Sequence, residues 1–170
     1  TTRALKNAGA RVIVPARRTS VAKAELAGVI DDADIFEMDL ADLKSVDRFV
    51  NKFSESKADL DILINNAAVM ACSQMPTKEG WDLQFAVNHI GHFFLTVGLL
   101  PKLAGSERAR VVSLSSTGHK LSGIRWEDVH FETSYDKWKS YGQSKTAASL
   151  LAVELDKRMR DKGIQAFAAH

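Results

Sequence analysis

The amino-acid sequence predicts an α/β fold built on an open, doubly wound parallel sheet. Short runs of apolar and β-branched residues alternate with longer stretches whose apolar residues recur at helical spacing. The short runs contain few polar residues, which is typical of strands covered on both faces by helices. This alternation indicates βαβ units, in which crossover helices connect parallel strands.

Five strands are expected, at residues 11–14, 34–38, 60–64, 110–114 and 164–168. Helices are expected at residues 20–27, 43–56, 78–103 and 139–161, and residues 1–8 have the pattern of a helix tail. Asp42 can cap the helix that follows it, while Gly9 and Gly163 lie where a helix gives way to a strand. No repeat or linker divides the chain, so residues 1–170 are expected to form one domain, truncated at both ends.

Composition makes several functions improbable. The chain has 170 residues, 45% of them hydrophobic, and a formal net charge of only +2. It lacks the basic stripe with which nucleic-acid-binding proteins contact phosphates, so no nucleic-acid partner is expected. The single Cys72 cannot form an internal disulfide, and no stretch approaches the roughly 18 apolar residues that span a bilayer. We therefore expect a cytoplasmic protein without a membrane span.

Tyr141 and Lys145 are separated by one helical turn and would share one face of a helix. A free phenol has a pKa of about 10. To act as an acid or base near neutrality, its pKa must fall by about two units, which corresponds to ~2.7 kcal/mol. An ammonium about 5 Å away supplies roughly 3 kcal/mol at an effective dielectric of about 20. The pair predicts an acid/base site, although YxxxK is frequent by chance, and an amphipathic helix with a surface Tyr and Lys is the alternative.

Ser115 and Ser116 follow the apolar segment 111–114, at the carboxyl edge where open α/β sheets bind ligands. A serine there can donate a hydrogen bond to a substrate carbonyl as negative charge develops, and the alternative is a serine that only ends a strand. A serine hydrolase is disfavoured because the segment lacks the glycines of a G-x-S-x-G elbow.

Amides follow or interrupt two other apolar segments. The strand at 60–64 runs into Asn65, Asn66 and two alanines, which allow a flat ligand to approach closely. Asn88 lies in an otherwise apolar helix, so it is either exposed or functionally bonded. His89 and His92 have a spacing that could ligate a metal, yet no carboxylate or cysteine cluster accompanies them. We expect ordinary helix histidines and no metal.

The strand-ending NNAA, the helix asparagine, the Ser-Ser strand end and YxxxK occur in the order typical of the short-chain dehydrogenase/reductase family. The sequence resembles that family over essentially all its residues, and YGQSK and NHIGHF resemble its retinol-dehydrogenase-like branch, including bacterial oxidoreductases of unassigned substrate. The resemblance implies an NAD(P)-binding, Rossmann-like domain and hydride transfer between a nicotinamide and a carbonyl or alcohol. It also implies an acid/base role for Tyr141, assisted by Lys145, an orienting role for Ser116, and Asn88 as the fourth member of the group.

Cofactor contacts are implied by the same motifs. Tyr141 and Lys145 would hold the nicotinamide ribose, and the remaining contacts would be Asn66, Ala67, Asp39 and Leu40, with helix capping as the alternative for Asp39. Arg17 and Arg18 stand where a family member reads the adenine ribose, and guanidinium groups suit a 2′-phosphate. We therefore expect NADP as the cofactor, with NAD as the alternative. The alternative role for the two arginines is that of exposed loop residues that contact only water.

The family begins with a strand and a glycine-rich turn, and neither precedes Thr1; a last strand is also missing after His170. The lost first strand would be central, so the sheet should be split and these residues alone should neither fold stably nor turn over. A homo-oligomer is implied by analogy.

The aromatic residues between Ser116 and Tyr141 could wall a bulky apolar site or pack the insertion onto the domain. These aromatic residues are Trp126, Phe131, Tyr135 and Trp138. A non-catalytic dinucleotide-binding sensor or scaffold is the alternative function.

Overall fold

The structure is a computed structural model that describes residues 1–56 and 58–170. Strands and helices alternate from one end of the chain to the other. In chain order they are α1 (Thr2–Asn7), β1 (Val14–Ala16), α2 (Thr19–Glu25), η1 (Asp32–Asp34), β2 (Ile35–Glu37), α3 (Leu43–Ser54), β3 (Ile62–Asn65), α4 (Leu83–Phe85), η2 (Ala86–Ile90), α5 (Gly91–Leu103), β4 (Ala109–Leu114), η3 (Thr117–Leu121), α6 (Lys137–Met159), η4 (Arg160–Lys162) and β5 (Ile164–Ala169).

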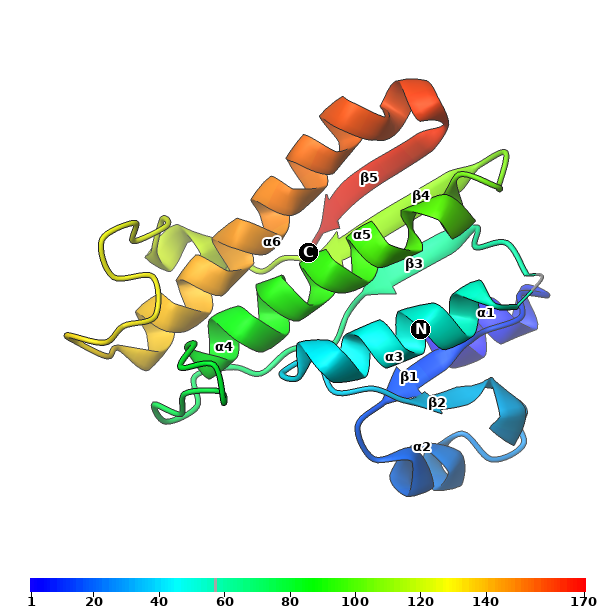
Figure 1. Ribbon diagram of the computed structural model, residues 1–170, viewed down its shortest axis with the longest axis horizontal. Helices are drawn as coiled ribbons and strands as arrows, with labels where there is room; N and C mark the ends of the chain where they lie inside the picture. The colour runs from blue at the N-terminus through cyan, green and yellow to red at the C-terminus, as the bar shows by residue number, and fades with distance from the viewer. Residues whose placement is uncertain (57) are drawn as a thin grey trace.

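The strands form two parallel sheets, which confirms the α/β class. One sheet pairs β1 with β2, and the other has the order β3-β4-β5, with β4 in the middle (Figure 1). No strand pairing joins the two sheets within residues 1–56 and 58–170. This separation agrees with the expectation that a doubly wound sheet without its central strand would be split.

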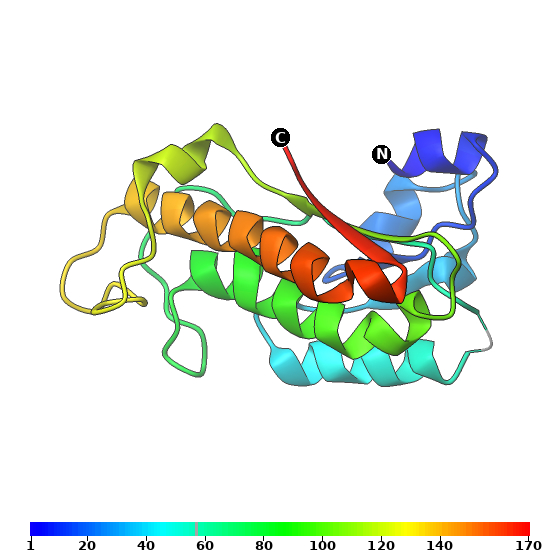
Figure 2. The same cartoon turned by 90° about the horizontal axis from the view of Figure 1, so that it is seen from above.

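The helices α3, α5 and α6 lie side by side on one face, and α1 lies on the other face (Figure 2). The apolar face of α3 is buried in the core through Val46, Phe49 and Phe53. Asp42 caps this helix by accepting a hydrogen bond from the backbone N–H of Lys44 at 3.0 Å, as predicted. The apolar face of α3 therefore packs against α5 and the sheet.

The first strand was predicted three residues too early. Arg11 lies outside β1, since only Val14–Ala16 pair with β2; its exposed guanidinium instead extends to the carboxylate of Asp34 at 2.8 Å. The other four strands overlap their predicted ranges. The long apolar helix also begins later than residue 78, since residues 76–82 form a turn in which Gly80 has φ +82° and Asp82 caps Leu83–Phe85.

The continuous helical stretch Leu83–Leu103 corrects the expectation that no segment is long and apolar enough to cross a membrane. It has 21 residues, its most apolar 18-residue window has a mean hydropathy of 1.3, and it passes that test by length and composition. Half of its most apolar window is buried inside the domain, and its buried residues include the polar Asn88 and His92. Packing in the protein core accounts for its composition, because a core helix has the same apolar content.

Candidate active site

The four residues predicted to share chemistry come from three elements that meet at the carboxyl edge of β4. Tyr141 and Lys145 lie on α6, Ser116 follows β4, and Asn88 lies in the π-helical turn η2. Tyr141 is 9% exposed, Lys145 4% and Asn88 3%, so the α6 pair and the asparagine are largely withdrawn from water. Burial makes each polar contact in this group energetically important.

Lys145 is held between Tyr141 and β4. Its Nζ lies 5.7 Å from the centre of the Tyr141 ring and donates a 2.8 Å hydrogen bond to the carbonyl of Leu114, the last residue of β4. Burial lowers the pKa of this ammonium. The cation is therefore fixed at the strand end beside the aromatic ring, one helical turn away, as the YxxxK spacing predicted.

Ser116 and the Tyr141 ring both lie against Gly118. The Ser116 hydroxyl accepts a hydrogen bond from the Gly118 N–H at 3.0 Å. A methyl group on Gly118 would lie 2.7 Å from Cε1 of Tyr141 and 3.3 Å from Oγ of Ser116, so a glycine is required for this approach. Ser115 instead contacts the Ser149 hydroxyl at 2.6 Å. Of the two serines, Ser116 is the one that shares the Tyr141 side of the strand end.

Asn88 is buried and bonded, and its amide makes three contacts. Oδ1 accepts from the Val69 N–H at 2.8 Å, while Nδ2 donates to the Val69 carbonyl and to the Ser144 hydroxyl, each at 2.9 Å. Ser144 in turn donates to the carbonyl of Tyr141 at 2.7 Å. Asn88 therefore ties the segment after β3 to the helix that carries Tyr141.

The segment after β3 has an exposed surface at the same sheet edge. Asn66 and Ala67 are exposed, as a cofactor-lining role requires, whereas Asn65 is buried. The Asn65 amide donates to Thr96 Oγ1 at 3.0 Å and to Ser113 Oγ on β4 at 3.3 Å. The first asparagine thus braces neighbouring elements, and the second is free to meet a ligand.

The remaining expected cofactor residues lie at the ends of β1 and β2. Arg17 and Arg18 are exposed directly after β1 and form no ion pair with any residue in the described ranges. Asp39 does not cap α3, since its carboxylate accepts the Ala41 N–H at 2.9 Å and closes a turn. Leu40 is 8% exposed and belongs to the core cluster.

His92 has a bonding role that its sequence position did not reveal. Its Nε2 lies 2.8 Å from the Ala67 carbonyl, so Nε2 must carry the proton, because a carbonyl only accepts. Burial chiefly lowers the pKa of His92, with Lys145 acting in the same direction, and burial lowers the pKa of His89 to about 4. No group of three or more metal-ligating side chains occurs within the part of the chain that the structure describes.

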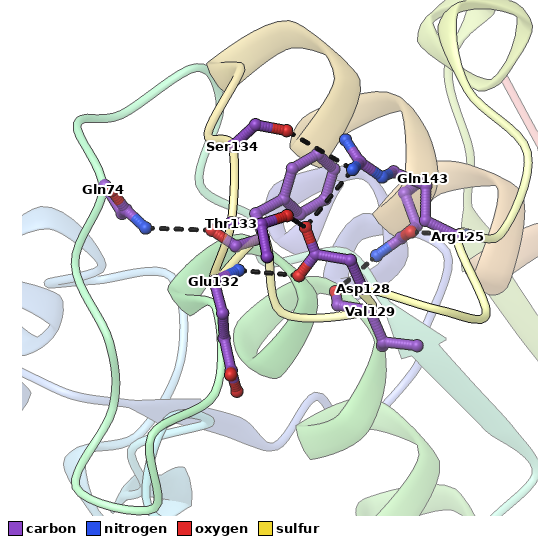
Figure 3. A network of polar contacts seen from close by, with 9 residues as sticks. Gln74, Arg125, Asp128, Val129, Glu132, Thr133, Ser134 and Gln143 are labelled. Atoms are coloured by element: carbon purple, nitrogen blue, oxygen red, sulfur yellow. Dashed lines mark hydrogen bonds and ion pairs between the residues drawn. The ribbon is translucent and has the colours of Figure 1, made fainter.

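The insertion between η3 and α6 is organised by the Asp128 carboxylate. It accepts hydrogen bonds from the Glu132 N–H at 2.7 Å, the Thr133 hydroxyl at 2.6 Å and the Arg125 guanidinium at 3.2 Å (Figure 3). Arg125 also lies 4.5 Å from the centre of the Phe131 ring. The contacts of this carboxylate fold the insertion onto itself.

The four aromatic side chains of the insertion have separate roles. Phe131 is fully buried, and the Tyr135 hydroxyl donates to the Cys72 carbonyl at 2.8 Å, so both pack the insertion onto the domain. Trp126 is 81% exposed and Trp138 is 47% exposed. Only these two tryptophans remain available to a ligand.

Comparison with known proteins is consistent with this geometry. The sequence pattern of the short chain dehydrogenase family matches residues 1–170. The chain is 41% identical over 177 residues to retinol dehydrogenase 12 of Mus musculus, covering 100% of this chain and 55% of that protein. It is 42% identical over 134 residues to retinol dehydrogenase 13 of Homo sapiens, covering 78% of this chain and 40% of that protein. The chain thus spans about half the length of the curated relatives it matches.

Two solved structures share the fold at 25% sequence identity or more. An uncharacterized protein from Mycobacterium paratuberculosis is 37% identical with a TM-score of 0.88, covering 99% of this chain and 61% of that chain. The RhlG/NADP active-site complex of Pseudomonas aeruginosa is 25% identical with a TM-score of 0.74, covering 98% of this chain and 64% of that chain. The pattern match over every residue, the parallel α/β architecture and these relatives show that the chain belongs to the short chain dehydrogenase family.

Proposed function

We propose that the protein is an NADP-dependent oxidoreductase that transfers hydride between a nicotinamide and a carbonyl or alcohol. The observation that carries the proposal is the convergence of Tyr141, Lys145 and Ser116 at the carboxyl edge of β4. Open α/β sheets bind ligands at this edge. Membership of a dehydrogenase family supports the reaction class.

Each side chain of the group suits one step of proton handling. In the direction of reduction, the Tyr141 phenol donates a proton to the carbonyl oxygen of the substrate, and in oxidation it accepts that proton. Ser116 already accepts from Gly118, so its own hydroxyl hydrogen is available for the same substrate oxygen. The Lys145 ammonium uses one of its three hydrogens on Leu114, which leaves two for the phenol side and a ribose hydroxyl.

The residues present fit a bound dinucleotide. Asn66 and Ala67 offer an exposed, sterically open strand end, and Lys145 stands beside it. The dinucleotide, when bound, supplies or accepts the hydride. Asp39 and Leu40, at the end of β2, are proposed to contact the adenine.

Preference for NADP over NAD is proposed from Arg17 and Arg18. Both guanidinium groups are exposed at the end of β1 and have no anionic partner among the described residues. A 2′-phosphate supplies that partner in a bidentate geometry. Michaelis constants for NADPH and NADH measure the preference, and a lower constant for NADH contradicts it.

The substrate is proposed to be bulky and apolar. Relatives at 41–42% identity are retinol dehydrogenases, and the exposed Trp126 and Trp138 offer aromatic surface near the start of α6. A series of aldehydes from short to long chain tests this, with kcat/KM expected to rise with chain length. Equal efficiency across the series contradicts the proposal.

A homo-oligomer is also proposed, because α5 and α6 expose apolar side chains on their outer surfaces. These are Phe93, Phe94, Val97, Leu150 and Val153. Exposed apolar residues grouped on neighbouring helices are typical of interfaces. Light scattering of the purified protein measures its mass, and a monomer at all concentrations contradicts this assignment.

Tyr141→Phe tests the reaction and separates it from a non-catalytic sensor. Removing one oxygen deletes the proton donor while the ring keeps its packing against Gly118. An enzyme loses carbonyl reduction by about a hundredfold or more and still binds NADPH. A dinucleotide sensor has no turnover to lose, so absence of NADPH oxidation in the unmodified protein with every carbonyl tested contradicts the enzymatic proposal.

A further inference from the structure

Gln84, at the start of the long apolar helix, is fully buried, and its amide lies within hydrogen-bond distance of four partners. Its Oε1 accepts from the Ala71 N–H at 2.8 Å. Its Nε2 lies 2.9 Å from the Lys137 carbonyl, 2.9 Å from the Ser140 hydroxyl and 3.0 Å from the Tyr135 hydroxyl. A buried amide with this many partners lies at the junction of three segments: the loop after β3, the insertion and α6.

The contacts of Gln84 repeat those of Asn88 one helical turn earlier. Gln84 binds the Ala71 N–H and Ser140, whereas Asn88 binds the Val69 N–H and Ser144. The two serines are themselves one turn apart on α6. Two buried amides on one helix therefore hold the same loop and the same partner helix at two successive levels.

Tyr141 lies between the two levels. Ser140 precedes it and Ser144 donates to its carbonyl at 2.7 Å. Ser140 is held a second time, because its hydroxyl donates to the buried Asp82 carboxylate at 2.7 Å. The start of α6, and with it the Tyr141 backbone, is thus fixed from both sides to the loop that follows Asn66 and Ala67.

Gln84 also bonds to Tyr135 and Lys137, in one wall of an open depression of about 380 Å³. One wall is formed by residues 72–74 and the other by residues 135–138. The Tyr135 hydroxyl accepts from Gln84 and donates to the Cys72 carbonyl at 2.8 Å, which connects one wall to the other. Loss of the Gln84 amide would remove one support from the 135–138 wall, one from the start of α6 and one from the loop at Ala71.

We propose that Gln84 is a positioning residue that sets the distance between Tyr141 and the loop after β3. The inference rests on the proposed oxidoreductase function and assigns to that site a residue outside the Asn88, Ser116, Tyr141 and Lys145 group. Gln84 acts through Ser140 and Ala71 and touches neither substrate nor cofactor. Small shifts in such a group have large effects on rate, since a displacement of about 1 Å costs up to roughly a hundredfold.

Gln143 provides a matched control on α6. It is also fully buried, its Oε1 accepts from the Arg125 N–H at 2.8 Å, and its Nε2 donates to the Val129 carbonyl at 2.8 Å (Figure 3). These bonds hold the insertion to α6 without reaching residues 69–71. Gln143→Met and Gln84→Met therefore remove similar buried amides, but only the latter removes a bond to the loop after β3.

The experiment compares Gln84→Met, Gln143→Met and the unmodified protein in the full-length polypeptide. NADPH oxidation is followed with decanal, together with the dissociation constant for NADPH, the melting temperature and the solvent deuterium isotope effect. Gln84→Met is expected to lower kcat by roughly tenfold to a hundredfold at an unchanged NADPH dissociation constant, with a larger isotope effect. Gln143→Met is expected to lower the melting temperature comparably and to leave kcat unchanged.

Ser140→Ala is the second variant, since it removes one contact of Gln84 and keeps the amide. It is expected to lower kcat in the same direction and by a smaller factor. If Gln84→Met and Ser140→Ala keep the kcat of the unmodified protein, the role of Gln84 is overturned while the proposed function stands. If the unmodified protein does not turn over any carbonyl, the proposed function is overturned and this inference with it.

Discussion

Ser115 and Ser116 are neighbours in the chain with different surroundings. The Ser115 hydroxyl contacts Ser149 at 2.6 Å, and the Ser116 hydroxyl faces Gly118 beside the Tyr141 ring. Ser116→Ala is expected to lower kcat by about a hundredfold, because a donor to the developing oxyanion is lost. Ser115→Ala is expected to cost about 1 kcal/mol of unfolding free energy and to leave kcat unchanged. Steady-state kinetics and urea denaturation of both variants measure the contrast, and equal losses of kcat refute the assignment.

His89 makes stability depend on pH above the range in which carboxylates titrate. Burial lowers its folded-state pKa from 6.5 to about 4, so the unfolded chain binds more protons between these values. The contribution of His89 to the free energy of unfolding is complete above its pKa in the unfolded chain. That contribution is lost as the pH falls below this value, by at most ~1.4 kcal/mol per pH unit. Urea denaturation at about pH 7.5 and about pH 5 is expected to show lower stability at the acidic value.

His89→Phe supplies the control for this pH dependence. The ring of His89 lies 5.2 Å from Phe85 and 6.3 Å from Phe93 between ring centres, so an aromatic replacement fits its surroundings. The variant is expected to lose less stability between the two pH values than the unmodified protein. Identical losses in both proteins mean that other groups bind the protons.

At the scale of elements, two glycines set how closely α5 approaches its neighbours. A methyl group on Gly91 would lie 2.3 Å from the Leu40 carbonyl oxygen, whereas one on Gly98 would meet only the Val50 side chain, at 2.8 Å. Gly91→Ala is expected to destabilise by about 2–3 kcal/mol, because backbone cannot yield to it. Gly98→Ala is expected to stay within about 1 kcal/mol, since gained helix propensity offsets the contact. Chemical denaturation measures both values, and equal effects contradict the explanation.

The sequence predicted elements best where a repeating apolar pattern specified them. The apolar face of α3 and its Asp42 cap follow from local residues, and so do the strands β4 and β5. Boundaries set by contacts distant in sequence were missed, as at Arg11, whose side chain binds Asp34. The turn before α4 was missed for a different reason, because the predicted helix was begun at residue 78, although Pro76 and Gly80 are residues typical of a turn.

In the candidate site, too, residues that belong to a local sequence pattern were predictable, and residues that depend on contacts distant in sequence were not. Motif residues such as Tyr141 and Lys145 were predictable because their spacing places them on one helical face. Gln84 and His92 carry no motif, and their partners lie in segments distant in sequence. A buried polar residue in an apolar helix was the only available signal, and it was applied to Asn88 alone.

At the scale of the molecule, the two sheets make residues 1–170 a weak folding unit on their own. Each sheet has open edges, and Ile62 on β3 and Phe167 on β5 are 42% and 43% exposed. Open strand edges and exposed apolar side chains favour association over independent folding. Calorimetry of this segment is expected to show no cooperative unfolding transition, and a single sharp transition contradicts the prediction.

The Asp128 carboxylate makes the insertion a self-supporting frame. Its contacts keep Phe131 buried with a φ of +57°, a left-handed backbone conformation that the surrounding bonds must maintain. Trp126, at 81% exposure, projects from this frame without supporting it. Replacements at Trp126 should therefore change the relative kcat/KM for different aldehydes and leave the expression yield unchanged. Replacements at Asp128 should lower both the expression yield and kcat/KM.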